Sequence, residues 1–207
     1  MRCITCVIER MDHLPPKQRF TNQDILEASL NILRRDGLDG LTARNLGSEL
    51  GSSSRPVFTV YKNMEEVQKE TIKAARVIYN TYIEKGLAEE NAFKGVGMQY
   101  IRFAVNEPRL FGLLFMMAGE RHYSLNEILP IIDDNSDKIL ASIQEEYKLP
   151  KDASYKLYQN MWIFTHGIAC LCATGVGNFL DDESSALLTE VFTSILIKIK
   201  SEGKSNG

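Results

Sequence analysis

The sequence predicts an all-α fold, and three features support this prediction. Apolar residues recur at the three- and four-residue spacing of helices through most of the chain. Residues that cap helix N-termini precede these segments, and glycine or proline follows most of them. The chain has 207 residues, of which 44% are hydrophobic and 25% charged, so it can bury a sizeable core. We expect an arm at 1–17, a small three-helix domain at 18–63, a larger helical domain at 64–201 and a frayed tail at 202–207.

The first helix is predicted to begin after Thr21 and to end at Gly37. A threonine hydroxyl accepts a hydrogen bond from the first backbone N–H groups, and glycine ends helices because it adopts positive φ angles. Between these two residues one helix face carries an apolar stripe: Ile25, Ala28, Ile32 and Leu33.

A second, short helix is predicted between Thr42 and Leu50. Thr42 is its expected N-cap, and Leu46 and Leu50 lie about one turn apart on the same face. Gly51 ends this helix and permits the tight turn that two crossing helices require.

The third helix is predicted from about Ser54 to Val60. Pro56 fits its first turn, where a missing N–H removes no intrahelical hydrogen bond. Asn63 is expected to cap the next helix, and Glu66 three residues later is expected to complete a capping box.

Three short helices joined by tight turns are typical of a DNA-binding helix-turn-helix. The third helix would enter the major groove, where Arg55 is the best candidate for a base contact because its guanidinium can bind two acceptors of guanine. We expect Val57 and Phe58 to pack under this helix. The expected contacts to bases and phosphates are Thr42, Arg44, Ser53, Ser54, Arg55, Thr59, Tyr61 and Lys62.

This segment resembles the N-terminal domain of TetR-family transcriptional regulators. The resemblance rests on fixed spacings, Leu41-Thr42-x-Arg44-x-Leu46, Leu50-Gly51-x-Ser53 and Val57-Phe58-x-x-Tyr61-x-Asn63-x-Glu65-Glu66-Val67. It implies a homodimeric repressor that binds a palindromic operator in double-stranded DNA. It also implies a small-molecule effector, bound in the larger domain, that controls DNA binding.

Three positions depart from the family pattern. Phe58 stands where a tyrosine that contacts phosphate is usual, Val60 where histidine is common, and Met64 where lysine often begins the fourth helix. Each departure removes a polar contact to the DNA backbone. An alternative is therefore a ligand- or partner-binding helical dimer that no longer reads DNA specifically.

From residue 64 onward the chain is predicted to be helical with short breaks. The predicted helices are 64–85, 91–106, 108–117, 125–147, 153–176 and 184–200. The paired acidic residues, among them Asp133 and Asp134, are expected to cap helices or to lie on polar faces.

Charge is distributed unevenly along the chain, whose net charge is −3. Residues 1–63 hold nine Lys and Arg against seven Asp and Glu, whereas residues 64–207 hold fifteen against twenty. Only the N-terminal part is thus expected to approach DNA without strong repulsion.

Aromatic and methionine side chains of the larger domain are expected to surround a small-molecule cavity, although a plain packed core is the alternative. The expected ligand contacts are Tyr100, Arg102, Phe103, Phe115, Met116, Tyr158, Trp162 and His166. Arg102 and His166 would orient a polar group of the ligand. The pattern Trp162-x-x-x-His166-Gly167, preceded by Tyr100-x-x-Phe103-Ala104 and Pro108-x-x-Phe111, resembles the WHG type of TetR ligand domain.

The last predicted helix carries a broad apolar stripe, and the helix before it is apolar nearly all round from Met161 to Cys172. Two such helices favour a four-helix bundle between two copies, and the TetR resemblance implies the same dimer. The expected interface residues are Leu188, Val191, Phe192, Ile195 and Ile199. The alternative is a core within one chain.

The sequence predicts no enzyme, no cofactor and no metal. Its three histidines lie in unrelated segments, and it has no metalloprotease motif, phosphate-binding loop or nucleophile elbow. Cys3-x-x-Cys6 lacks the two further ligands of a structural zinc site, but a thiol or metal sensor that uses this pair is a second alternative. No apolar run reaches the length of a membrane span, so a cytoplasmic protein is expected. Met11 is a second candidate for the start of the chain.

Overall fold

A computed structural model describes residues 20–117, 124, 127, 129 and 133–205 of the chain. Within these residues the fold is all-α, as predicted from the sequence. The helices are α1 (Asn22–Asp36), α2 (Ala43–Glu49), α3 (Val57–Val60), α4 (Met64–Leu87), α5 (Ala92–Asn106), α6 (Pro108–Phe115), α8 (Ser136–Tyr147), α9 (Lys151–Ala173) and α10 (Asp181–Ser205), with a 3-10 turn, η1 (Leu38–Gly40), after α1.

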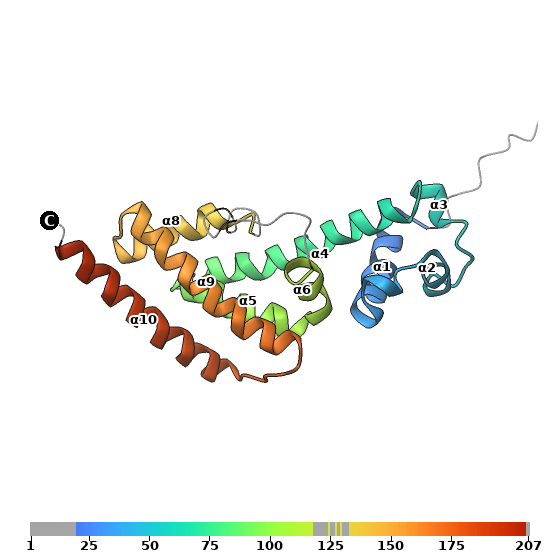
Figure 1. The fold of residues 1–207 in the computed structure, drawn as a ribbon. Coiled ribbons are helices and arrows are strands. Elements are labelled where there is room, and N and C mark those ends of the chain that lie inside the picture. The colour runs from blue at the N-terminus through green and yellow to red at the C-terminus, as the bar shows by residue number, and fades with distance from the viewer. Residues whose placement is uncertain (1–19, 118–123, 125–126, 128, 130–132, 206–207) are drawn as a thin grey trace, which may run out of the picture.

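The molecule has a small end and a large end, joined by α4 (Figure 1). We call α1 to α3 the head, and α5 to α10 the body. The head has its own apolar cluster, built around Ile25, Leu46 and Val57, and Val67 at the start of α4 belongs to it. Further along α4, Ala75, Tyr79 and Ile83 instead belong to the cluster of the body. In the body α5 packs against α4, α9 and α10.

The predicted N-caps of the first two helices are confirmed. Thr21 Oγ1 accepts a hydrogen bond from Asp24 N at 3.2 Å, and Thr42 Oγ1 accepts one from Asn45 N at 3.2 Å. Asp24 also accepts from Thr21 N at 2.7 Å, which completes a capping box at α1. Gly37 ends α1 with a φ of 76°, a value that favours glycine.

The boundaries around α3 differ from the prediction. The helix begins at Val57 rather than Ser54, because a residue that precedes proline is disfavoured in the α conformation. Asn63 caps α4 as predicted, accepting from Glu66 N at 2.9 Å. The Glu66 carboxylate, however, accepts from Lys62 N at 2.7 Å, one residue before the position that a capping box requires.

The single helix predicted at 125–147 is wrong. Residues 133–135 form a break before α8, where Asp133 accepts a hydrogen bond from Asn135 N at 2.9 Å. Such side-chain to backbone bonds compete with helix formation. α10 is longer than predicted and extends from Asp181 to Ser205, into the segment 202–207 that was expected to be a frayed tail.

None of the helices in the described part of the chain combines the length and the apolarity needed to span a membrane.

Candidate nucleic-acid interface and ligand cavity

The turn between α2 and α3 packs closely against Gly47. A Cβ atom on Gly47 would lie 2.7 Å from Ser54 N and 2.8 Å from the carbonyl carbon of Ser53. Ser52 N also donates to Gly47 O at 2.8 Å. The close contact holds α3 at a set angle against α2, and it requires a residue without a side chain.

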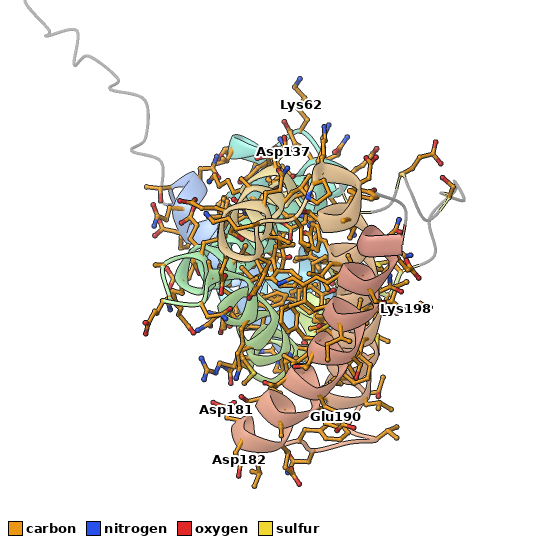
Figure 2. All side chains as sticks on the ribbon, turned by 90° about the vertical axis from the view of Figure 1, so that its left-hand side faces the viewer. Lys62, Asp137, Asp181, Asp182, Glu190 and Lys198 are labelled. Carbon is orange, nitrogen blue, oxygen red and sulfur yellow. The ribbon has the colours of Figure 1, made fainter. Side chains whose placement is uncertain are left out.

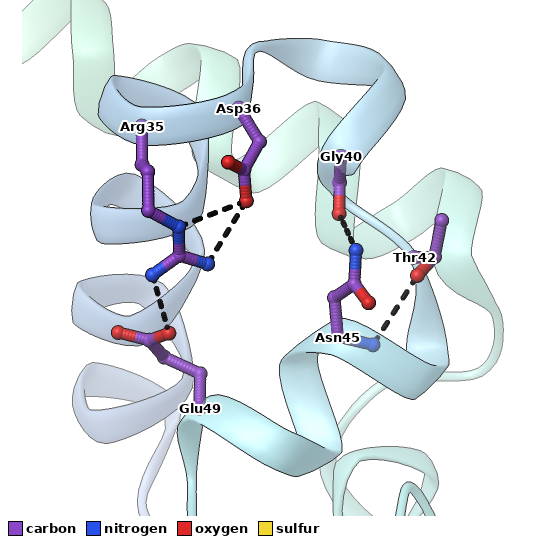
Figure 3. A network of polar contacts seen from close by, with 6 residues as sticks. All are labelled: Arg35, Asp36, Gly40, Thr42, Asn45 and Glu49. Atoms are coloured by element: carbon purple, nitrogen blue, oxygen red, sulfur yellow. Dashed lines mark hydrogen bonds and ion pairs between the residues drawn. The ribbon is translucent and has the colours of Figure 1, made fainter.

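A polar network fixes α2 relative to α1 (Figure 3). Arg35 at the end of α1 pairs with Glu49 at the end of α2, with a distance of 3.0 Å between Nη1 and Oε2. At the other end of α2, Asn45 Nδ2 donates to Gly40 O at 2.9 Å. These contacts lie beside the apolar cluster of the head and orient α2 and the turn that follows it.

Most of the residues predicted to contact DNA are exposed on the head. The exposed residues are Thr42, Arg44, Ser53, Arg55, Thr59 and Lys62, and Ser54 is half-buried. Lys62 projects clear of the fold (Figure 2). Within the described residues, no ion pair engages Arg44, Arg55 or Lys62. Their charges are thus available to a polyanion.

Two predictions for this surface were wrong. Tyr61 is only 4% exposed, and its hydroxyl donates a hydrogen bond to Asn22, so it belongs to the core of the head. Phe58, which was expected to pack under α3, is 43% exposed, while Val57 is fully buried. Successive side chains of a helix point about 100° apart, and in α3 Val57 points into the core of the head while Phe58 points outward. Phe58 therefore adds an apolar element to the exposed face of α3.

The body contains a cavity of about 260 Å³ between α5, α9 and α10. Three of the eight predicted ligand contacts line it, namely Tyr100, Tyr158 and Trp162. The sequence did not assign to the cavity several other residues that line it: Phe93, Lys94, Asp133, Tyr147, Leu188 and Phe192. These residues come from separate segments and share no local motif.

The other five predicted ligand contacts lie outside the cavity lining. Arg102 forms an ion pair with Asp181, with 2.7 Å between Nη2 and Oδ2. Phe103 is fully buried, and Phe115 packs edge-on against the ring of Tyr79. Met116 is 44% exposed.

His166, the fifth of these residues, stands behind the cavity wall. Its Nδ1 atom lies 2.9 Å from the hydroxyl oxygen of Tyr100, and its ring stacks on Trp162 with 4.9 Å between centroids. Burial lowers the pKa of His166, which favours the neutral imidazole. His166 thus positions two lining residues and does not itself reach the cavity.

Asp133 was expected to cap a helix, but it lines the cavity and is only 3% exposed. Its Oδ2 atom accepts a hydrogen bond from the Tyr79 hydroxyl at 2.7 Å, and Oδ1 accepts from Asn135 N. Burial raises the pKa of Asp133, although these two hydrogen bonds oppose the shift.

The predicted dimer residues of α10 face their own chain. Leu188 is 3% exposed and would lie 3.3 Å from a Cβ atom on Gly97, and Ile199 is 7% exposed. Phe192 packs against Phe93 and Tyr147, and Val191 and Ile195 are half-buried against the same cluster. As interface residues, Leu188 and Ile199 were wrong, because the body itself covers them.

No protein-family model and no curated protein matches the chain. Among the described residues, His, Cys, Asp and Glu side chains form no group of three that could hold a metal ion. Cys3 and Cys6 lie outside the described residues.

Proposed function

We propose that this chain is a TetR-type transcriptional repressor that binds operator DNA through the exposed face of α2 and α3. The observation that carries the proposal is a basic surface beside a closely packed turn: Arg44, Arg55 and Lys62 are exposed and form no ion pair with any residue that the structure describes. Arg55 and Phe58 are the proposed contacts to base edges, since arginine binds guanine and an apolar ring contacts the thymine methyl group. The proposed contacts to phosphates are Thr42, Arg44 and Lys62.

The test of this function is a selection of bound sequences from random duplex DNA, using the full-length protein at near-physiological salt. We expect a palindrome whose half-sites lie about one helical turn apart. If no sequence is enriched, the result would instead favour the alternative, a ligand- or partner-binding helical dimer that does not recognise DNA specifically.

Arg55→Ala is expected to weaken binding to the recovered operator by about 1–3 kcal/mol, because one bidentate guanine contact is lost. Binding is measured by fluorescence anisotropy of a labelled duplex. Lys198→Ala is the matched control, since it removes the same charge from an exposed position on α10 (Figure 2). Equal affinities for the two variants would remove Arg55 from the interface.

We propose further that two copies associate through the outer faces of α9 and α10. These faces expose Ile163, Leu171 and Ile197 at 46%, 41% and 64%. A Cβ atom on Gly167, between the first two along α9, would meet no atom within 4 Å, so a second helix can approach the backbone there.

Ile163→Glu combined with Leu171→Glu is expected to convert the dimer into a monomer, because it places two charges in a desolvated interface. Light scattering should then give half the wild-type mass. Val77→Glu is the control, since Val77 is 63% exposed but lies on α4. A double variant that keeps the wild-type mass would contradict this interface.

The effect of a ligand bound in the cavity would be transmitted to the head through α5 and α6. The cavity is lined partly by α5, and Glu107 lies between α5 and α6. Glu107 accepts two hydrogen bonds from Arg34 of α1, at 2.8 Å from Nε and 2.7 Å from Nη2. An effector shifts the head only if it binds more tightly to the arrangement that does not fit DNA.

A further inference from the structure

One polar group in the cavity lining is the hydroxyl group of Tyr158. Tyr158 is only 4% exposed, and no described residue forms a hydrogen bond with its hydroxyl group. Burial raises the pKa of Tyr158, so the group stays a neutral phenol. A buried hydroxyl without a partner costs stability. A ligand that reaches this group would therefore gain affinity.

The second polar group is the carboxylate of Asp133. From the described residues each of its oxygens accepts one hydrogen bond, from Tyr79 of α4 and from Asn135 of its own segment, and a carboxylate oxygen can accept a second one. The charged groups that act on it are Arg76 of α4, which favours the anion, and Asp134, which opposes it. A positive group in the cavity would offset the cost of burying this carboxylate.

Much of the rest of the lining is aromatic. Phe93 and Tyr158 meet edge to face with 6.1 Å between centroids, and Trp162, Tyr100 and Phe192 line the same space. The faces of such rings attract cations. Lys94 also lines the cavity, but it is exposed at the rim, where solvent screens its charge.

We propose that the cavity binds a small aromatic molecule with one protonated amine, and that the ammonium group donates hydrogen bonds to the Asp133 carboxylate and to the Tyr158 hydroxyl oxygen. A volume of about 260 Å³ lies just below the usual range of ligand sites, so the ligand is smaller than a typical drug. A carboxylate ligand is disfavoured because it would place a second negative charge beside Asp133. The inference rests on the proposed effector site, but binding itself requires no DNA.

The test uses Trp162, which is the only tryptophan of the chain and lines the cavity. Its fluorescence in the full-length protein is titrated with three probes of matched size: 2-phenylethylamine, 2-phenylethanol and 3-phenylpropionate. The expected result is saturable binding of the amine, binding of the alcohol at least about tenfold weaker, and no binding of the carboxylate. An alcohol that binds as well as the amine, a carboxylate that binds best, or no saturable response to any probe overturns the proposal.

Two variants test which residues bind the ammonium group of the ligand. Asp133→Asn should weaken binding of the amine at least about tenfold while leaving the alcohol little changed, because only the charge of the site is lost. Tyr158→Phe should weaken both probes, and it removes only a hydroxyl without a described partner, so the fold is retained even if Asp133→Asn fails to fold. Asp181→Asn is the control outside the cavity, and an amine affinity that falls equally there would overturn the assignment.

The outcome is separable from that of the DNA selection. Amine binding without any enriched operator would support the amine site and contradict the proposed repressor. An enriched operator without amine binding would support the repressor and contradict the amine site.

Discussion

Gly47→Ala is expected to lower the free energy of unfolding of the head by about 3 kcal/mol and to abolish DNA binding. The new methyl group would lie 2.7 Å from Ser54 N and 3.1 Å from Ser52 O, both of them backbone atoms. Neither atom can rotate away as a side chain would. The turn must therefore separate from α2, which moves Arg55 and Phe58 away from their positions on the surface.

Two measurements check this expectation. Thermal unfolding followed by circular dichroism should show a loss of about 5–10 °C, and operator binding should disappear in the anisotropy assay. Ser48→Ala is the matched control, because Ser48 is the next residue of α2 and is exposed. A Gly47→Ala protein with the stability and affinity of Ser48→Ala would show that the turn is not held by this contact.

Gly86→Ala is expected to destabilise the body by about 3 kcal/mol or more, again because backbone meets backbone. A Cβ atom on Gly86 of α4 would lie 2.6 Å from Val96 N and 2.7 Å from the carbonyl carbon of Gly95 on α5. Conversely, a Cβ atom on Gly95 would lie 2.4 Å from Gly86 O, so neither helix can yield by moving one side chain. The two helices must separate, which opens the apolar cluster between them.

Gly112→Ala is a control that is expected to change the free energy of unfolding in the opposite direction. Gly112 lies in α6, and a Cβ atom there would meet nothing within 4 Å. Alanine should thus stabilise this helix by up to about 1 kcal/mol, as its higher helix propensity predicts. Chemical denaturation of the two variants should move the midpoint in opposite directions, and a shift in the same direction would contradict the role of the close crossing.

Local signals predicted the helices of this protein well. Thr21, Thr42 and Asn63 cap the helices that the sequence assigned to them, since a cap depends on residues within three positions of it. The break at residues 133–135 was missed although one of its contacts is local, namely the hydrogen bond that Asp133 accepts from Asn135 N. The burial of Asp133 depends instead on the hydrogen bond from Tyr79, 54 positions away in the sequence. No short window of sequence contains that contact.

The candidate sites were predicted less completely, for a related reason. Periodicity tells which residues of α10 share a face, but it does not tell whether that face meets its own body or a second copy. Leu188 and Phe192 were therefore assigned to a dimer, while they line the cavity of their own chain. Tyr61 was assigned to phosphate, although its partner Asn22 lies 39 positions earlier.

Because α4 is a single helix of 24 residues, it is about 36 Å long and belongs to both apolar clusters. Under the proposed function, α4 would act as a lever arm, in which a short displacement at one end becomes a larger swing at the other. A tilt of about 5° moves its far end by about 3 Å, close to the rise of one base pair, about 3.4 Å. In the proposed symmetric pair both arms would swing, so such a tilt would put the two heads out of register with successive turns of the operator DNA.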